Sequence, residues 1–108
     1  MYRATTPTHT FTLPETLDNY AEIQVTYKQC KAELVKDAKA DGPVSSGMDF
    51  DEKEVIIHWT QEETLMFDTS KPLLAQVRVV DVNGNVMASQ KFSIQIKYTL
   101  NEEILEVE

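Results

Sequence analysis

Two β-rich runs separated by a glycine turn constrain the fold of this chain most. Residues 74–82 and 86–98 alternate apolar with polar side chains, and residues 83–85 between them read Asn-Gly-Asn. Asn-Gly can supply the two residues of positive φ that a type I′ hairpin turn requires. The pattern therefore predicts an antiparallel hairpin with one buried and one wet face. The apolar face of its second run holds Phe92, Ile94, Ile96 and Tyr98.

Three further segments show the same alternation. Residues 8–13 lie between Pro7 and Pro14, which suits an edge strand, where a missing N–H donor costs least. Residues 21–28 form a second strand. Residues 54–59 carry apolar side chains on both faces, which predicts a more central position. The inward-facing residues we expect are His9, Phe11, Leu13, Ile23, Val25, Tyr27, Val55, Ile57 and Trp59.

Residues 30–36 are less clear. We expect a strand in a meander, but residues 31–39 are good helix formers and a helix is the alternative. Residues 60–63 read Thr-Gln-Glu-Glu, a capping box that predicts a short helix before the hairpin. The sum is an all-β fold: an immunoglobulin-like antiparallel β-sandwich with one short helical turn. We assign residues 1–98 to this sandwich domain and residues 99–108 to an acidic amphipathic C-terminal tail.

Composition excludes several classes of function. A chain of 108 residues forms one domain, and a net charge of −8 with a pI near 4.7 disfavours binding to nucleic acids and anionic membranes. Cys30 is the sole cysteine, so an intrachain disulfide is impossible, which fits a reducing cytoplasm. We find no signal peptide and no apolar run near the ~20 residues of a membrane span.

Catalytic and metal-binding constellations are missing from the sequence. It contains no nucleophile elbow, phosphate-binding glycine loop, zinc motif or paired cysteine. We expect His9 and His58 to be exposed or locally hydrogen-bonded, and Cys30 to be a half-buried thiol. The acids of residues 49–54 lack the spacing of a calcium loop and predict a solvated loop. We therefore predict no catalytic residue, no cofactor and no metal.

Aromatic residues offer one binding hypothesis. Trp59, Tyr27, Phe92 and Tyr98 could form a sugar-binding platform, but their alternation with polar residues predicts that most of them lie in the core. A platform would require Trp59 or Tyr98 to be exposed beside a polar groove.

Two segments are candidates for protein interaction. The tail carries apolar residues among acids, and a free tail would expose them without gain. It either folds back on its own domain or docks on a neighbouring copy as a helix or added strand. The nearly uncharged segment of residues 1–14, whose edge strand contains Phe11, is the second candidate, since an open edge can pair with another subunit; a plain first strand is the alternative. The tail residues concerned are Leu100, Ile104, Leu105 and Val107.

Several segments together carry a family resemblance. They are residues 2–11, 23–29, 60–65 and 75–79, the glycine turn, Ala88-Ser89 and residues 100–105. They resemble small proteins encoded in prophages and siphophages of Gram-positive gut bacteria. The layout is also similar to the N-terminal domain of phage baseplate upper proteins, a β-sandwich that anchors receptor-binding parts to the tail. Baseplate proteins of that kind are longer, with coiled-coil or receptor-binding parts that this sequence lacks, and the resemblance supplies no catalytic residue.

The resemblance implies a non-enzymatic structural protein of a phage tail or baseplate. It would be made in the bacterial cytoplasm and reside in the virion. Its partners would be its own copies, giving a homo-oligomer, or other phage structural proteins. The alternative function is a carbohydrate- or receptor-binding β-sandwich module.

Overall fold

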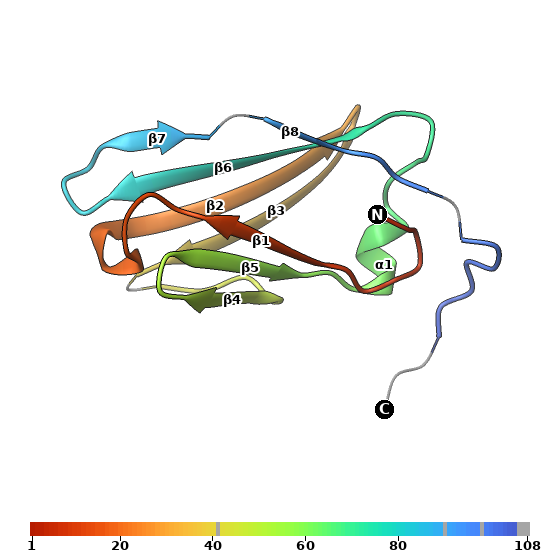
Figure 1. Cartoon of the computed structure of the whole chain (residues 1–108), viewed down its shortest axis with the longest axis horizontal. Helices are drawn as coiled ribbons and strands as arrows, with labels where there is room; N and C mark the ends of the chain where they lie inside the picture. Colours follow the sequence, from red (N-terminus) through yellow and green to blue (C-terminus); the bar gives the residue numbers. More distant parts are fainter. Residues whose placement is uncertain (41, 90, 98, 106–108) are drawn as a thin grey trace.

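The computed structural model describes residues 1–40, 42–89, 91–97 and 99–105. It is mostly β, with two antiparallel sheets and one short helix among the described residues (Figure 1). A three-stranded sheet has the order β1-β5-β4; a five-stranded sheet has the order β3-β2-β6, with both β7 and β8 on the free side of β6. The strands are β1 (Thr8–Thr12), β2 (Tyr20–Gln29), β3 (Ala32–Lys39), β4 (Met48–Asp51), β5 (Glu54–His58), β6 (Leu73–Asp81), β7 (Val86–Ala88) and β8 (Phe92–Ile94).

The five-stranded sheet is built on the long strands β2 and β6. Their apolar residues alternate in register, so that Val25 lies opposite Val77 and Ile23 opposite Val79, all on the buried face. Strand β3 follows through a tight turn in which Cys30 has φ of +50°. The helix alternative for residues 31–39 is wrong, because a full ladder to β2 outweighs the helix propensity of these residues.

The turn between β6 and β7 differs from the predicted type I′ turn. Gly84 has φ of +89°, but Asn83 is not in the positive-φ region that a type I′ turn needs at both positions. The loop is one residue longer: Gly84 N–H donates to the Asp81 carbonyl at 3.1 Å, and Asp81 N–H donates to the Asn85 carbonyl at 2.9 Å. The Asp81 carboxylate accepts from the N–H groups of Asn83 and Asn85, which stabilises this longer form.

The predicted continuous strand over residues 86–98 is also wrong, because the chain breaks into β7 and β8. At the break, Ser89 satisfies both backbone groups of Val77 on the neighbouring strand β6. Its Oγ accepts from Val77 N–H at 3.0 Å, while Ser89 N–H donates to the Val77 carbonyl at 2.8 Å. Of the predicted apolar face, Ile96 is buried and Phe92 is exposed; Tyr98 lies outside the described residues.

The three-stranded sheet confirms two predictions. Strand β1 lies at the edge, and β5 is central between β1 and β4. The inward residues of β5, Val55 and Ile57, are fully buried and join one core cluster with residues of the large sheet. Strand β4 was not predicted, and it takes Asp49 and Asp51 out of the expected loop.

Tyr27 and Trp59, both buried, form an aromatic cluster between the sheets with the partly buried His9, and Phe67 packs against Trp59. We call it the sealed cluster. Trp59 Nε1 donates to His9 Nδ1 at 3.2 Å, and Tyr27 Oη lies 2.9 Å from the same nitrogen. An indole N–H can only donate, so Nδ1 accepts and His9 is neutral, with its proton on Nε2. Burial, assisted by the N-terminal ammonium, lowers the pKa of His9; burial also raises the pKa of Tyr27.

Helix α1 (Gln61–Thr64) closes one end of the core and has the predicted capping box: Thr60 Oγ1 accepts from Glu63 N–H, and Glu63 accepts from Thr60 N–H. Glu63 also binds Lys36 Nζ at 2.6 Å, and Lys36 is buried on the inner face of β3. Burial alone would raise the pKa of Glu63, but the bonds from Lys36 and Thr60 outweigh it and lower the pKa.

Candidate interaction surfaces

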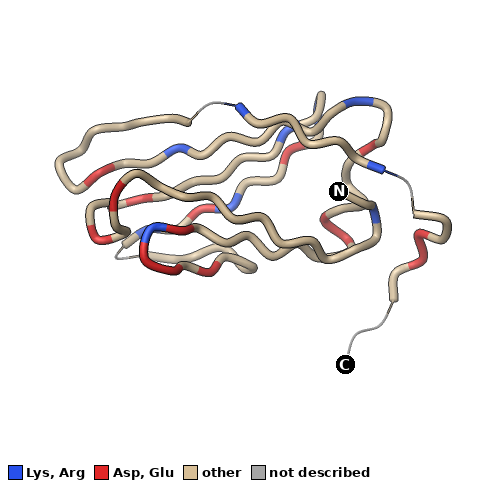
Figure 2. The backbone as a smooth tube through the Cα atoms, viewed as in Figure 1, with Lys and Arg blue, Asp and Glu red and all other residues tan. Residues whose placement is uncertain are grey.

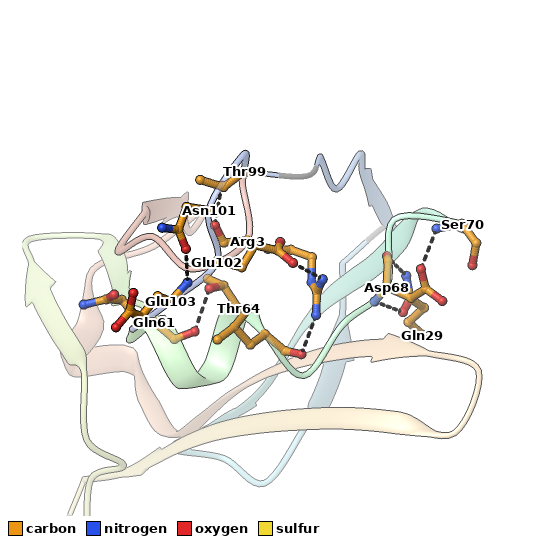
Figure 3. Close-up of polar contacts among 11 residues, drawn as sticks. Arg3, Gln29, Gln61, Thr64, Asp68, Ser70, Thr99, Asn101, Glu102 and Glu103 are labelled. Atoms are coloured by element: carbon orange, nitrogen blue, oxygen red, sulfur yellow. Dashed lines mark hydrogen bonds and ion pairs between the residues drawn. The ribbon is translucent and has the colours of Figure 1, made fainter. Parts of the chain in front are cut away.

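The first surface is the C-terminal segment, residues 99–105, which folds back on its own domain through the Leu105 backbone and the side chains of Thr99 and Glu102 (Figure 3). The Gln61 side-chain amide forms two hydrogen bonds with the backbone of Leu105. Its N–H donates to the Leu105 carbonyl and its carbonyl accepts from Leu105 N–H, both at 2.8 Å. Thr99 Oγ1 donates to the Arg3 carbonyl at 2.6 Å. The segment is therefore held at both ends, without forming a helix.

Arg3 ties this segment to α1. Its Nη1 donates to Glu102 Oε1 at 2.7 Å, and its Nη2 donates to the Leu65 carbonyl at 3.2 Å (Figure 3). The Arg3 and Glu102 side chains are both mostly buried, so water weakens this ion pair less than it weakens a fully exposed pair. The contacts join the N-terminus, α1 and the C-terminal segment into one corner of the molecule.

The apolar side chains of the C-terminal segment stay partly or fully exposed despite this anchor. Leu100 is fully exposed, and Ile104 and Leu105 are 46% and 69% exposed. Val107 lies outside the described residues. The segment thus combines a fixed backbone with unburied apolar side chains.

The second surface is an apolar groove of about 570 Å³ between the two sheets. Strand β1 forms one wall and β7 with β8 forms the other, while Val77 and Val79 of β6 form the floor. Phe11 lies in this groove, 6.0 Å from the Phe92 ring. The lining comprises Thr10, Phe11, Thr12, Leu13, Pro14, Tyr20, Val77, Val79, Met87, Ala88, Ser89 and Phe92, none of them charged.

The groove is open because the small sheet stops short of the edge of the large one. Met87 lies opposite Val79, and Phe92 lies opposite Ala75, so both belong to the inner face of the large sheet. Ala75 and Val79 are buried, but Met87 and Phe92 are 45% and 44% exposed. No described strand beyond β1 covers them. Sequence reasoning missed this site, since apolar alternation marks a face without showing whether another sheet reaches it.

The wall formed by β1 also presents an open backbone edge. Trp59 N–H donates to the Pro7 carbonyl at 3.0 Å, and Leu13 N–H donates to the Lys53 carbonyl at 2.7 Å. Alternate residues of an antiparallel strand face the same neighbour, so the groups of residues 7, 9, 11 and 13 face β5. The N–H and C=O groups of Thr8, Thr10 and Thr12 face the other side, where the described residues provide no strand.

These two surfaces lie apart. The C-terminal segment lies beyond α1, on the opposite side of the molecule from β7 (Figure 1). Residues 4–14 and 82–90 contain no charged side chain, and the strands that border the groove are uncharged over these lengths (Figure 2). The structure therefore does not bring Phe11 together with Leu100, Ile104 or Leu105 in one site.

Polar candidates from the sequence are dispersed. His58 Nε2 lies 2.8 Å from Asp49 Oδ2 on the surface, while His9 is in the sealed cluster. Cys30 is exposed rather than half-buried, with Lys71 Nζ 3.1 Å from its sulfur, because the turn points it outward. Among the described residues, no three His, Cys, Asp or Glu side chains are grouped to hold a metal ion. No described helix has the length and apolarity to cross a membrane.

The comparisons with known proteins add no relative: no family model matches the chain, and no curated protein matches it.

Proposed function

We propose that this protein is a non-enzymatic structural component of a phage or prophage tail or baseplate. In this proposal the two sheets form an immunoglobulin-like sandwich that assembles with its own copies or with other phage structural proteins. The chain would be made in the bacterial cytoplasm and would reside in the virion. The proposal is supported by the resemblance described above and by the two apolar surfaces.

One observation carries the proposal: the C-terminal segment presents apolar side chains on a backbone that is already fixed. In a lone molecule Leu100 and Leu105 stay mostly exposed and Ile104 is only half buried. Burying one such side chain in an interface is worth about 1.5–3 kcal/mol. Ordering a flexible segment on binding costs conformational entropy. Gln61 and Arg3 already order this segment, so binding to a partner would not carry that cost.

The charge of the protein fits assembly with selected partners. A net charge of −8 opposes random association of copies, and the exposed apolar residues sit beside Glu102 and Glu103. Association then requires a partner surface that is apolar and is not acidic.

Light scattering after size exclusion tests the proposal. The full-length chain should form a defined oligomer, and a version that ends at Tyr98 should be a monomer. A triple variant, Leu100→Ser, Ile104→Ser and Leu105→Ser, should also be a monomer, although Gln61 binds only the backbone of Leu105 and the anchor can remain. Glu103→Ser is the matched control and should assemble as the full-length chain does.

If the full-length chain and both variants are monomers of equal stability, self-assembly through the C-terminal segment is wrong. The carbohydrate-binding alternative predicts an exposed Trp59 or Tyr98. Trp59 is 2% exposed in the aromatic cluster, and Tyr98 lies outside the described residues.

A further inference from the structure

We propose that the groove beside β1 is a strand-acceptor site, and that its occupant is the C-terminal segment of a second copy of this chain. This inference rests on the proposed function and names the contact through which copies would assemble. It joins three observations: an open backbone edge, an apolar floor, and an unpartnered apolar segment at the far end of the molecule.

The groove has the features that an added strand needs. Thr8, Thr10 and Thr12 turn their backbone N–H and C=O groups toward it, and these groups can form a new antiparallel or parallel ladder. Below that edge lie Val77 and Val79, ready to receive the side chains of alternate residues. An added strand would extend the small sheet to four strands and cover Met87 and Phe92.

The far wall of the groove hinders a simpler arrangement, in which the β1 edges of two copies pair with each other. Two copies could pair β1 with β1 about a two-fold axis perpendicular to the sheet, as antiparallel edges commonly do. In each copy, however, β7 and β8 of the large sheet project past β1 on the same side of the small sheet. The two projecting edges would then meet in the same space, so the groove admits a single strand more readily than a whole second sheet.

The sequence of the C-terminal segment fits this space. Leu105 and Val107 alternate with Glu106 and Glu108, so an extended chain presents two apolar side chains to the groove and two carboxylates to water. Residues 99–108 contain four glutamates and no lysine or arginine. The groove lining is uncharged, and charges of both signs border it: Lys91 directly precedes Phe92, whereas Glu15 directly follows Pro14 and Glu54 lies opposite Thr12.

The contact would be heterologous, since one copy contributes its segment and the next contributes its groove. The C-terminal segment lies on the opposite side of the molecule from β7, which borders the groove (Figure 1). Such contacts repeat from copy to copy and close into a ring or continue as a fibre. A symmetric dimer would not result from a single contact of this kind.

A labelled peptide with the sequence of residues 99–108 provides the direct test, with fluorescence anisotropy on the full-length chain. The peptide should bind, and a peptide with Leu105→Ser and Val107→Ser should bind at least tenfold more weakly. A peptide with Glu106→Ser and Glu108→Ser keeps the apolar face and should lose less affinity. The peptide variants cannot disturb the fold of the receptor.

The receptor is tested by two neighbouring substitutions. Met87→Lys places a charge in the groove and should weaken peptide binding and self-association at least tenfold. Val86→Lys, on the same strand, is the matched control, because Val86 is 62% exposed on the outer face and does not line the groove. It should behave as the unsubstituted chain does.

The outcomes separate this inference from the proposed function. A chain that self-associates, does not bind the peptide and is insensitive to Met87→Lys overturns the acceptor groove and leaves assembly standing. A chain that neither binds the peptide nor self-associates overturns the groove and self-assembly together. Peptide binding that Met87→Lys abolishes and Val86→Lys preserves supports the groove.

Discussion

His9 and Phe11 lie on the same face of the same strand, yet they enter two different environments. His9 joins Tyr27 and Trp59 in a cluster closed by both sheets, where its ring nitrogen accepts hydrogen bonds. Phe11 lies two residues further along, in a groove whose other wall holds the half-exposed Met87 and Phe92. The sealed half of the inter-sheet space satisfies polar groups, whereas the open half leaves apolar groups in water. Stability should therefore depend on the first half and association on the second.

The largest expected effect is in the sealed half. Trp59→Ala removes a ring that lies 4.5 Å from Tyr27 and packs edge-on to Phe67, and it leaves a cavity that the two sheets cannot close. We expect a loss of about 3–5 kcal/mol in the free energy of unfolding, measured by urea denaturation. Phe92→Ala in the groove is the matched control and should cost only about 1 kcal/mol, since that side chain is half exposed. Equal losses would contradict the comparison.

The next largest effect on the free energy of unfolding should come from breaking the ion pair between Lys36 and Glu63. Lys36→Met keeps most of the side-chain volume but leaves Glu63 without its cation in a largely buried position. We expect a loss of about 2–3 kcal/mol, below the usual range for a broken buried pair because Glu63 keeps its bond to Thr60 N–H. The double variant Lys36→Met, Glu63→Gln should recover part of this loss. A single variant as stable as the original chain would show that the pair is not buried in solution.

Alternation in the sequence was enough to predict the strands that form the core, since burial of one face determines their register. Residues 54–59 and 21–28 are examples, and their inward residues are buried as expected. Strand β4 escaped prediction because Met48–Asp51 is short and half acidic; its pairing with β5 decides its structure. The prediction of a type I′ turn at Asn-Gly was wrong because of a contact outside the dipeptide. The Asp81 carboxylate accepts hydrogen bonds from two loop N–H groups and stabilises a longer loop.

The candidate surfaces were predictable only in part. Leu100, Ile104 and Leu105 could be selected from the sequence, because apolar side chains in an acidic tail have no obvious place in the core. Phe11 could be selected because its nearly uncharged strand was expected at an open edge. The role of Gln61 as the anchor of Leu105 could not be predicted from the sequence, because it depends on a contact between residues 44 positions apart. The groove depends on how far one sheet overhangs the other, and local patterns carry no information on that offset.

A smaller effect should appear as a dependence of stability on pH. The pKa of His9 is lowered in the folded protein, so the unfolded chain, with a pKa near 6.5, takes up the proton first. Stability is then fully present above about pH 6.5 and is lost as the pH falls below it, by at most about 1.4 kcal/mol per pH unit for one proton. Denaturation curves between pH 7 and 5 measure this slope. His9→Phe should flatten it, and an unchanged slope would mean that another group is responsible.

The smallest expected effect is the one that separates stability from association. Met87→Lys places an ammonium group at a half-exposed position on an edge strand, where the long side chain can reach water. The free energy of unfolding should change by no more than about 0.5 kcal/mol, as it should for Val86→Lys on the outer face. The same two variants should differ at least tenfold in self-association. If Met87→Lys destabilised the fold by several kcal/mol, the groove would belong to the core in solution, and the division between a sealed and an open half would be wrong.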